Sequence, residues 1–326
     1  MSSLVGWILL AVRFGTVIMF GSLGEIMTQK SGNLNLGVPG LMYLGAFAGF
    51  VGAYSYETSV ENPNAFLSVT IAILACFAAA MLGGLIYSFL TITLRANQNV
   101  TGLALTTFGT GIANFLGTFV MKGSIAIKAD FTSKIFRKPV PYLSGLGVFG
   151  DIFFSHGFLV YVAIILAVFL SFFLNRTRAG LNLRAVGENP ATADAAGINV
   201  TKYKYLATCL GAGITGLGGL FYIFDYNNGI WATTDDIGGL GWLAVALVIF
   251  TTWKPVNAIW GAYVFGMLFW LYQYLPSLLG INIPPDIARM APYVVTIIVL
   301  IAISLRRKKE NQAPSSLGLS YFREER

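Results

Sequence analysis

Long apolar stretches alternate with short polar segments along the whole chain. Most of the apolar stretches hold about 17 to 25 residues, which is the length that a helix needs to cross the hydrocarbon core of a bilayer. The predicted spans cover residues 4–28, 37–55, 65–93, 101–121, 157–175, 204–224, 238–252, 256–275 and 287–305. The pattern predicts an all-α, polytopic membrane protein with about nine transmembrane helices.

One polar segment, "GENPATADAAGINV" at residues 187–200, predicts a short helix within a loop. Asn189 is a typical N-cap, and Pro190 fits the first helical turn without the loss of a hydrogen bond. Gly197 is a typical helix stop. A helix of about two turns is too short to be stable on its own. The residues alone therefore indicate either a partner-binding helix or a solvated loop.

The distribution of basic residues predicts the orientation, because Lys and Arg are enriched in cytoplasmic loops. Of the 21 basic residues, six lie in the tail 306–326, and five lie in the loop 176–203 or at its edge. Three more in short loops fall on the same side, against five in the loop 122–156. We expect the loop 176–203 and the tail to be cytoplasmic, and the loop 122–156 and the N-terminus to lie outside.

The composition excludes several kinds of chemistry. Only 11% of the residues are charged, against about 25% in a typical soluble domain, so residues 1–326 are expected to form a single transmembrane domain. No G-x-x-x-x-G-K-[ST] motif is present, so the chain is not expected to bind ATP phosphates or to be an enzyme. Two cysteines and a single histidine give no basis for a metal site, a disulfide framework or a cofactor.

Two charged side chains interrupt the first span. Arg13 is expected to face the interior of the bundle or a polar cavity, because a charge in contact with lipid is costly. Glu25 lies near the inner end of the span. It has either a substrate or coupling role, or it forms an ion pair with Lys30.

Polar side chains recur on one face of the predicted span 101–121. Thr106, Thr110 and Asn114 follow at four-residue spacing, which places them on one side of a helix. They either line a solute pathway or form hydrogen bonds with neighbouring helices. The segment "SGNLNLGVPG" predicts irregular backbone around Asn33 and Asn35, which either exposes polar groups to a pathway or forms a plain turn.

Four segments carry a resemblance to a known family: "KSGNLNLGVPGLMYLGA", "RAVGENPATADAAGINVTKYK", "GWLAVALVIFTTWKP" and "SSLGLSYFREER". With these segments in order along nearly the whole chain, it resembles the permease subunits of ABC importers for nucleosides. Those belong to a larger group that includes simple-sugar and branched-chain amino acid permeases. The family pattern usually carries Gly where this chain has Thr251 and Thr252, and an Asn where it has Thr106.

The resemblance implies that the segment 187–200 is a coupling helix, which docks in a cleft of an ATPase subunit. The residues expected to serve this contact are Glu188, Asn189, Pro190, Ala193, Asp194, Ala195 and Gly197. The residues expected along the solute pathway are Asn33, Asn35, Thr106, Thr110, Asn114 and Trp242.

The same resemblance implies the partners of an importer in a bacterial cytoplasmic membrane. These are ABC ATPase subunits, a second permease subunit that is identical or different, and an extracytoplasmic solute-binding protein or lipoprotein. ATP hydrolysis on the ATPase would drive alternating access and carry a small polar solute, a nucleoside or a simple sugar, into the cell. Nucleic acid is not an expected partner.

Two alternatives remain open at this point. A stand-alone secondary transporter for a small polar solute would need an ion-coupling site, and the spans show no clear carboxylate pair for one. A structural or receptor membrane protein would need no coupling helix.

Overall fold

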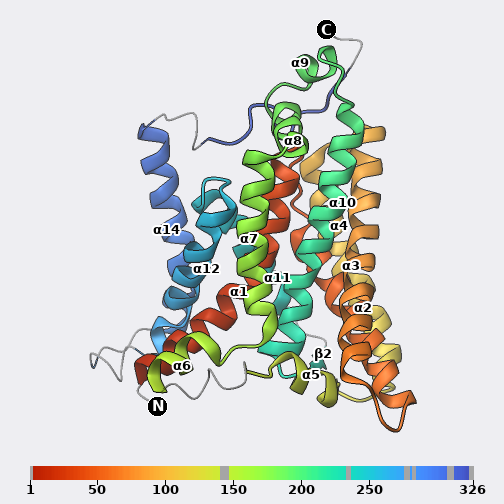
Figure 1. Cartoon of the computed structure of the whole chain (residues 1–326), viewed down its shortest axis with the longest axis vertical. Helices are drawn as coiled ribbons and strands as arrows, with labels where there is room; N and C mark the ends of the chain where they lie inside the picture. The colour runs from red at the N-terminus through yellow and green to blue at the C-terminus, as the bar shows by residue number, and fades with distance from the viewer. Residues whose placement is uncertain are drawn as a thin grey trace.

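The computed structural model describes residues 3–139, 147–232, 236–274, 280, 284–306 and 312–322 of the chain. Its long helices lie side by side in one bundle (Figure 1). Helix α1 begins at one end of this bundle, and the last described residues lie at the other end (Figure 1). We call the second of these the tail end, and the first the opposite end.

The long helices match the predicted spans. They are, in chain order, α1 (Ser3–Gln29), α2 (Val38–Ser59), α3 (Ala65–Ser88), α4 (Gln98–Met121), α7 (Phe158–Arg176), α10 (Val200–Phe221), α11 (Asp236–Phe250), α12 (Pro255–Phe269) and α14 (Pro285–Arg306). Helices α3 and α10 continue as π-helical turns, η1 (Phe89–Thr93) and η2 (Tyr222–Tyr226). Among the described residues, seven helices are long and apolar enough to cross a membrane, and α11 and α12 are shorter apolar helices. The predicted all-α, polytopic architecture is confirmed.

Short elements connect these helices. They are β1 (Ala126–Lys128), α5 (Asp130–Phe136), α6 (Gly147–Phe154), α8 (Arg178–Glu188), α9 (Pro190–Ala195) and β2 (Ile230–Ala232). Strand β1 pairs with β2 in antiparallel register, with Ile127 opposite Trp231. Three-residue strands are too short to show a periodic pattern, so the sequence predicted only a loop at β1.

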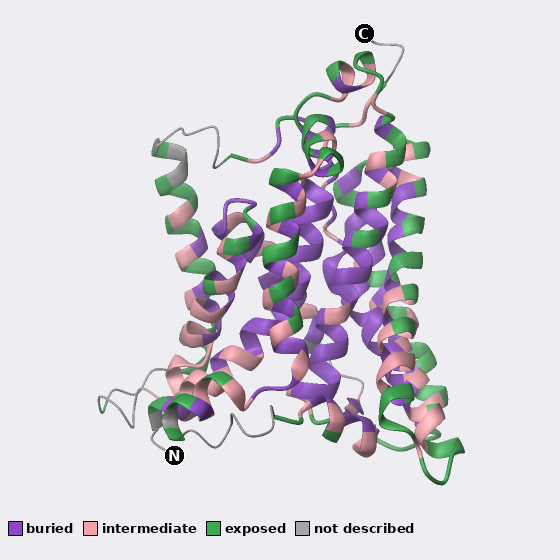
Figure 2. Ribbon diagram, in the orientation of Figure 1, coloured by how far each residue is buried: buried purple, intermediate pink, exposed green. Residues whose placement is uncertain are grey.

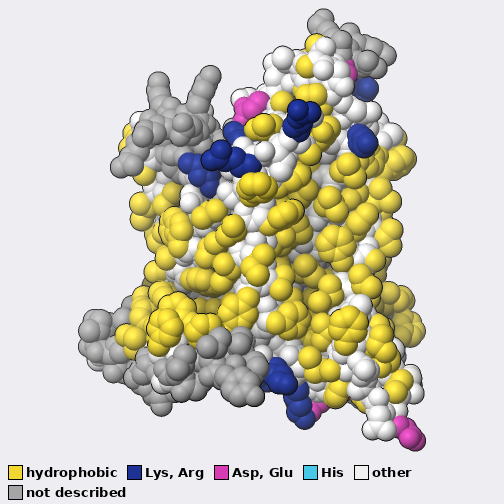
Figure 3. Space-filling model, in the orientation of Figure 1, with side chains coloured by type: hydrophobic (Ala, Val, Ile, Leu, Met, Phe, Trp, Pro, Cys, Tyr) yellow, Lys and Arg dark blue, Asp and Glu magenta, His cyan; other side chains and the backbone are white. Residues whose placement is uncertain are grey.

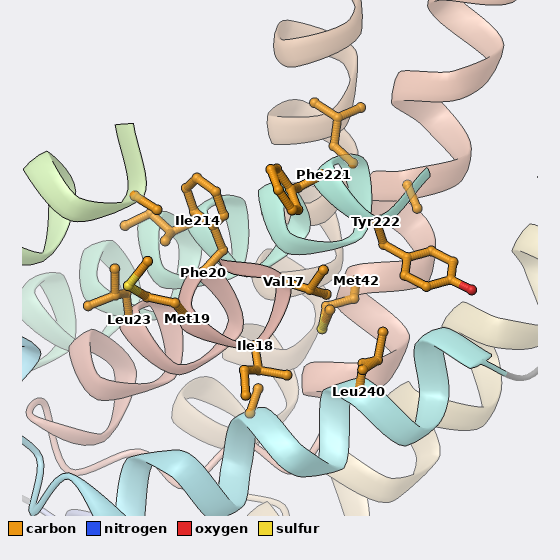
Figure 4. Close-up of a cluster of buried hydrophobic side chains, with 14 of the residues drawn as sticks. Val17, Ile18, Met19, Phe20, Leu23, Met42, Ile214, Phe221, Tyr222 and Leu240 are labelled. Atoms are coloured by element: carbon orange, nitrogen blue, oxygen red, sulfur yellow. The ribbon is translucent and has the colours of Figure 1, made fainter. Parts of the chain in front are cut away.

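The core lies where α1, α2, α10 and α11 meet. Apolar side chains from these helices and from the first residue of η2 pack together there (Figure 4): Val17, Ile18, Met19, Phe20, Leu23, Met42, Ile214, Phe221, Tyr222 and Leu240. Helices α1 and α10 touch through their backbones, since a Cβ built on Gly24 would lie 2.2 Å from the carbonyl oxygen of Gly211. Such close approach through small residues is typical of packing between membrane helices.

The outer helices present apolar side chains on the surface. In the most apolar stretch of α10, 83% of the positions are buried, whereas in that of α14 only 12% are. Burial thus decreases from the centre of the bundle to its periphery (Figure 2). On the face in Figure 3, a broad band of hydrophobic side chains separates Lys and Arg residues at the two ends. An apolar band of this kind is expected of a surface in contact with lipid.

Candidate functional site

The segment between α1 and α2, residues 30–37, has irregular backbone but is largely buried. Side chains from neighbouring helices supply its hydrogen bonds. The backbone N–H of Leu34 donates to Oε1 of Gln98 at 2.7 Å, and the hydroxyl of Tyr87 donates to the carbonyl of Leu34 at 2.6 Å. Non-helical backbone survives at membrane depth only with such partners, and here α3 and α4 provide them.

The two asparagines of this segment have different surroundings. The side-chain Oδ1 of Asn35 accepts a hydrogen bond from the backbone N–H of Gly37 at 2.8 Å, which stabilises a local turn. Asn33 donates from Nδ2 to the hydroxyl of Thr208 on α10 at 2.9 Å. Its Oδ1 is buried and has no hydrogen-bond partner among the described residues. Asn33 therefore keeps a free acceptor.

A chain of buried side chains links this segment to the turn between α11 and α12. Nε1 of Trp253 donates to Oε1 of Gln29 at 2.5 Å, and Nε2 of Gln29 donates to Oε1 of Glu25 at 2.8 Å. The same carboxylate oxygen accepts the backbone N–H of Asn35 at 3.1 Å. Glu25 thus stabilises the irregular segment. Lys30, its other expected partner, lies within electrostatic range of Arg184 and Glu188, and burial lowers its pKa to about 8.

The polar face of α4 is partly buried against α2. The hydroxyl of Thr106 donates to the carbonyl of Leu36 at 2.9 Å, where the family pattern would place an Asn. Thr110 and Asn114 are half-buried, and Oδ1 of Asn114 is a buried acceptor without a partner among the described residues. Two polar side chains therefore retain hydrogen-bonding capacity on this face.

Trp242 lies on α11 and is 37% exposed. Its neighbour Gly241 abuts Pro39 at the start of α2, while Gly109 of α4 abuts Gly40. Helices α11 and α4 therefore both pack against the first turn of α2. The structure thereby brings the predicted pathway residues of α4 and α11 to the same stretch of the molecule.

The short helix predicted near residue 190 is confirmed as α9. The side chain of Asn189 accepts the backbone N–H of Thr192 at 3.0 Å, and Pro190 occupies the first turn. The chain leaves the helix through Gly197, whose φ of 83° is favourable only for glycine. The amphipathic helix α8, which the apolar spans did not reveal, precedes it at the tail end (Figure 1).

The residues of α9 divide between an internal and an external face. Ala193 is 3% exposed and packs with Val186 and Val200 inside the protein. Ala195 and Gly197 are exposed. Ala193 therefore anchors the helix, while the small exposed residues beside it present a surface without bulky side chains.

The tail clasp, which we define as residues 313–322, binds to this helix pair. Ser315 donates from its backbone N–H and from its hydroxyl to Oε2 of Glu188, at 3.3 and 2.8 Å. Tyr321 donates to Oδ2 of Asp194 at 2.9 Å. The two predicted coupling carboxylates are thus occupied by contacts within the chain. From the sequence, the tail was expected only to be cytoplasmic, and its contacts with Glu188 and Asp194 were not predicted.

Two more contacts fix the clasp to the bundle. The carbonyl of Gly187 accepts both the backbone N–H and the hydroxyl of Ser316, and the carbonyl of Gly32 accepts the backbone N–H of Gly318 at 3.1 Å. The ring of Phe322 lies under the guanidinium of Arg95, 4.5 Å from its centroid. The clasp therefore connects α8 and α9 with the segment 30–37.

A second charged cluster lies towards the opposite end. Nε of Arg13 is buried and lies 3.6 Å from Oδ1 of Asp225 in η2, while 29% of the Arg13 side chain is exposed. The Nε of Arg13 therefore faces the interior, as expected, but the side chain as a whole is only partly buried. Nearby, Nε2 of His156 donates to the carbonyl of Ile152 at 3.0 Å. Burial, together with the charge of Arg13, lowers the pKa of His156 to about 4. Asp225 carries no signal in the sequence, because it follows directly after a predicted span.

No group of three or more His, Cys, Asp or Glu side chains that could hold a metal ion occurs in the described part of the chain. The described residues offer unpaired hydrogen-bonding groups in the partly polar region around α2 and α4. They offer an exposed surface of small residues on the helix pair α8 and α9 at the tail end.

Comparison with known proteins gives consistent matches. Residues 7–300 match the family described as branched-chain amino acid transport system, permease component. A Haloferax volcanii protein, provisionally named a glucose ABC transporter permease, is 35% identical, with 99% of each chain covered. A nucleoside ABC transporter permease of Lactococcus lactis is 33% identical, covering 95% of this chain and 94% of that protein. A guanosine ABC transporter permease of Bacillus subtilis is 31% identical, covering 96% and 95%.

Proposed function

Because this chain belongs to the family of branched-chain amino acid transport system permeases, we propose that it is the permease subunit of an ABC importer for nucleosides or related simple sugars. Its relatives are named for glucose, for nucleosides and for guanosine. A hydroxyl-bearing sugar ring is the part that these solutes share. In this proposal, residues 1–326 form one permease domain in the cytoplasmic membrane, with the tail end inside the cell.

The observation that carries the proposal is the geometry of α9. This six-residue helix is held by its own caps, by Ala193 and by the tail clasp, and it leaves Ala195 and Gly197 exposed. A rigid, small-residue surface of this kind suits insertion into a groove of an ATPase subunit, because shape complementarity needs a preorganised contact. Closure of two ATPase subunits would then move α8 and α9 and switch the bundle between two packings.

The solute pathway follows the polar face of α4 in this proposal. Thr110 and Asn114 offer polar groups on a half-buried face, and Trp242 offers an aromatic surface on α11. A second permease subunit would cover this side, and an extracytoplasmic binding protein would deliver the solute to the opposite end. A stand-alone secondary transporter is the alternative, in which the buried Glu25 would bind the coupling ion.

The coupling contact is tested by Ala195→Arg in cells that also produce the ATPase subunit. Overfilling a close contact costs about 1–3 kcal/mol, which corresponds to a complex weakened about 5- to 150-fold. We expect normal abundance of the chain in the membrane, with little co-purified ATPase and little uptake of labelled nucleosides or pentoses. Ala185→Arg, also at an exposed alanine but on α8, is the control. Wild-type uptake by the Ala195→Arg variant would refute the docking role of α9.

The pathway is tested by Asn114→Leu. The substitution keeps the branching and the number of heavy atoms of the side chain and removes its amide, so we expect uptake to fall several-fold while the protein still assembles with its ATPase. The control is Phe115→Leu, one position away on the exposed face. If the Asn114→Leu variant takes up solute at the same rate as the Phe115→Leu control and the wild type, the polar face of α4 serves packing alone.

A further inference from the structure

A polar cavity of about 740 Å³ opens at the tail end, between the exit of α9 and the bundle. Its walls come from five parts of the chain: the segment 30–37, the stretch from η1 to the start of α4, the end of α9, the first turns of α10 and the tail clasp. We call it the tail-end cavity. None of the functions proposed above for α9 or for α4 uses it.

The described lining residues give the tail-end cavity a positive charge. Arg95, Lys202 and Lys204 line it, against a single carboxylate, that of Asp194. This carboxylate already accepts a hydrogen bond from Tyr321. The excess of cationic groups favours an anionic ligand.

Lys204 is the most informative of the three cations. It is only 3% exposed, and none of the ion pairs found among the described residues involves it. One turn further along α10, Thr208 holds Asn33, so Lys204 and Asn33 share one wall of the cavity. A buried ammonium group without a counter-charge is costly, which indicates a site that is complete only with an anion.

Two helix N-termini meet the same cavity. Helix α4 begins at Gln98 after the cap residue Asn97, and α10 begins at Val200 after the cap residue Asn199. Gln98, Asn199 and Val200 all line the cavity. The positive ends of both helix dipoles therefore add to the attraction for an anion, as in known phosphate sites.

The free acceptor of Asn33 adds a second requirement. Its Oδ1 is buried, has no partner among the described residues, and belongs to a side chain that lines the cavity. A carbonyl oxygen needs a donor, which a fully ionised phosphate lacks and a hydroxyl group supplies. The volume also lies within the range of about 300–1,000 Å³ that is typical of sites for small organic ligands. We propose that the tail-end cavity binds a small, hydroxyl-bearing phosphate monoester, such as a sugar phosphate or a nucleoside monophosphate.

Such a ligand would act on coupling. Its phosphate would bridge Lys202 and Lys204 of α10 with Arg95, and its hydroxyl would reach Asn33. Because α9 and the tail clasp form the remaining walls, an occupied cavity would hold the coupling helix in one position. The cytoplasmic origin of the ligand rests on the proposed orientation of the chain, whereas the binding itself does not.

The test is calorimetric titration of the full chain in phosphatidylcholine nanodiscs. Ribose 5-phosphate and uridine monophosphate are compared with ribose, uridine and inorganic phosphate. We expect both monoesters to bind, and each of the other three probes to bind about tenfold more weakly or not at all. Lys204→Met and the exposed Lys202→Met should each weaken the monoesters about tenfold. Lys138→Met, at the opposite end, is the control and should bind like the wild type.

Several results would overturn the proposal. Equal affinity for uridine and uridine monophosphate would assign the cavity to the solute pathway. Equal affinity for inorganic phosphate and the two monoesters would remove the role of Asn33. Displacement of the monoesters by phosphatidic acid in the disc would assign the cations to a lipid headgroup. No binding by any probe would leave the cavity without the proposed ligand. Since this assay uses no ATPase and measures no uptake, each of these results would leave the proposed import function standing.

Discussion

Two consecutive residues in the turn between α11 and α12 adopt left-handed backbone. Thr252 has a φ of 53° and Trp253 a φ of 55°, a conformation that costs roughly 1–2 kcal/mol for a residue with a Cβ. Glycine, which the resemblance implies at Thr252, would avoid this cost at that residue. The chain gains in exchange a Trp253 side chain directed at Gln29, within the buried network of Glu25. We interpret the strain as the cost of fixing this contact.

The buried His156 predicts an acid-sensitive fold. Its pKa is lowered from 6.5 to about 4, so between these values the unfolded chain binds more protons than the folded one, and stability falls as the pH falls. The difference corresponds to a loss of roughly 3 kcal/mol by the time the pH reaches the lower value. Thermal unfolding of the purified protein should show this loss. His156→Gln, which can still donate to Ile152, should have a flatter profile.

Residue-scale features were predictable where their causes are local. The caps Asn189 and Gly197 depend on the residue itself and its nearest neighbours, and both were recognised from sequence. The pairing of Arg13 with Asp225 depends on the packing of α1 against η2, and the free acceptor of Asn33 depends on α10. Neither contact leaves a pattern along the chain.

At the scale of elements, the tail clasp is what gives α8 and α9 a fixed position. The two helices are short, and a helix of six residues such as α9 has no independent stability. Hydrogen bonds from Ser315, Ser316 and Tyr321 hold them from outside, and Ala193 packs from inside. The proposed coupling surface is therefore a composite of two segments far apart in the sequence.

Removal of the clasp should loosen the coupling helix while the bundle remains intact. A chain that stops after residue 312 loses the contacts to Gly187, Glu188 and Asp194, each worth about 0.5–1.5 kcal/mol. We expect amide hydrogen exchange in residues 187–199 to speed up about tenfold or more, with unchanged exchange in α1 and α10. A chain that stops after Phe322 retains every one of these contacts and serves as the control. Unchanged exchange without the clasp would show that α8 and α9 are stable alone.

The sequence revealed the elements unequally. Nine spans and α9 were predicted, because apolar length and end signals are strong and local. Helix α8, the strands β1 and β2, and the clasp were not, because each is stabilised by a distant segment. The polar face of α4 was visible, but its division into a bonded Thr106 and an unpaired Asn114 needed the positions of α2 and the segment 30–37.

At the scale of the whole molecule, the two ends of the bundle differ. The tail end carries α8, α9 and the clasp, whereas the opposite end carries β1, β2, α5 and α6 (Figure 1). The long helices separate residues 176–203 in space from β1, α5 and α6, the described elements between residues 126 and 154 (Figure 1). The apolar band between the two ends fixes how the molecule lies in a bilayer.

The basic residues predict which end faces the cytoplasm. A reporter enzyme fused after residue 310 should be active inside the cell, and one inserted near residue 140 should be active outside. Each site is fused in turn to a reporter that is active only inside the cell and to one that is active only outside. The two results at each site then control for each other. Both reporters on one side would contradict the number of spans, and exchanged sides would contradict the orientation.

The composite nature of the coupling surface has a consequence for biosynthesis. The clasp is translated after every described helix, yet it completes the support of α9 (Pro190–Ala195). A nascent chain therefore carries an α9 without this support until residues 313–322 have emerged from the ribosome. In the proposed importer, only a chain that already carries the clasp would present a supported α9 to an ATPase subunit.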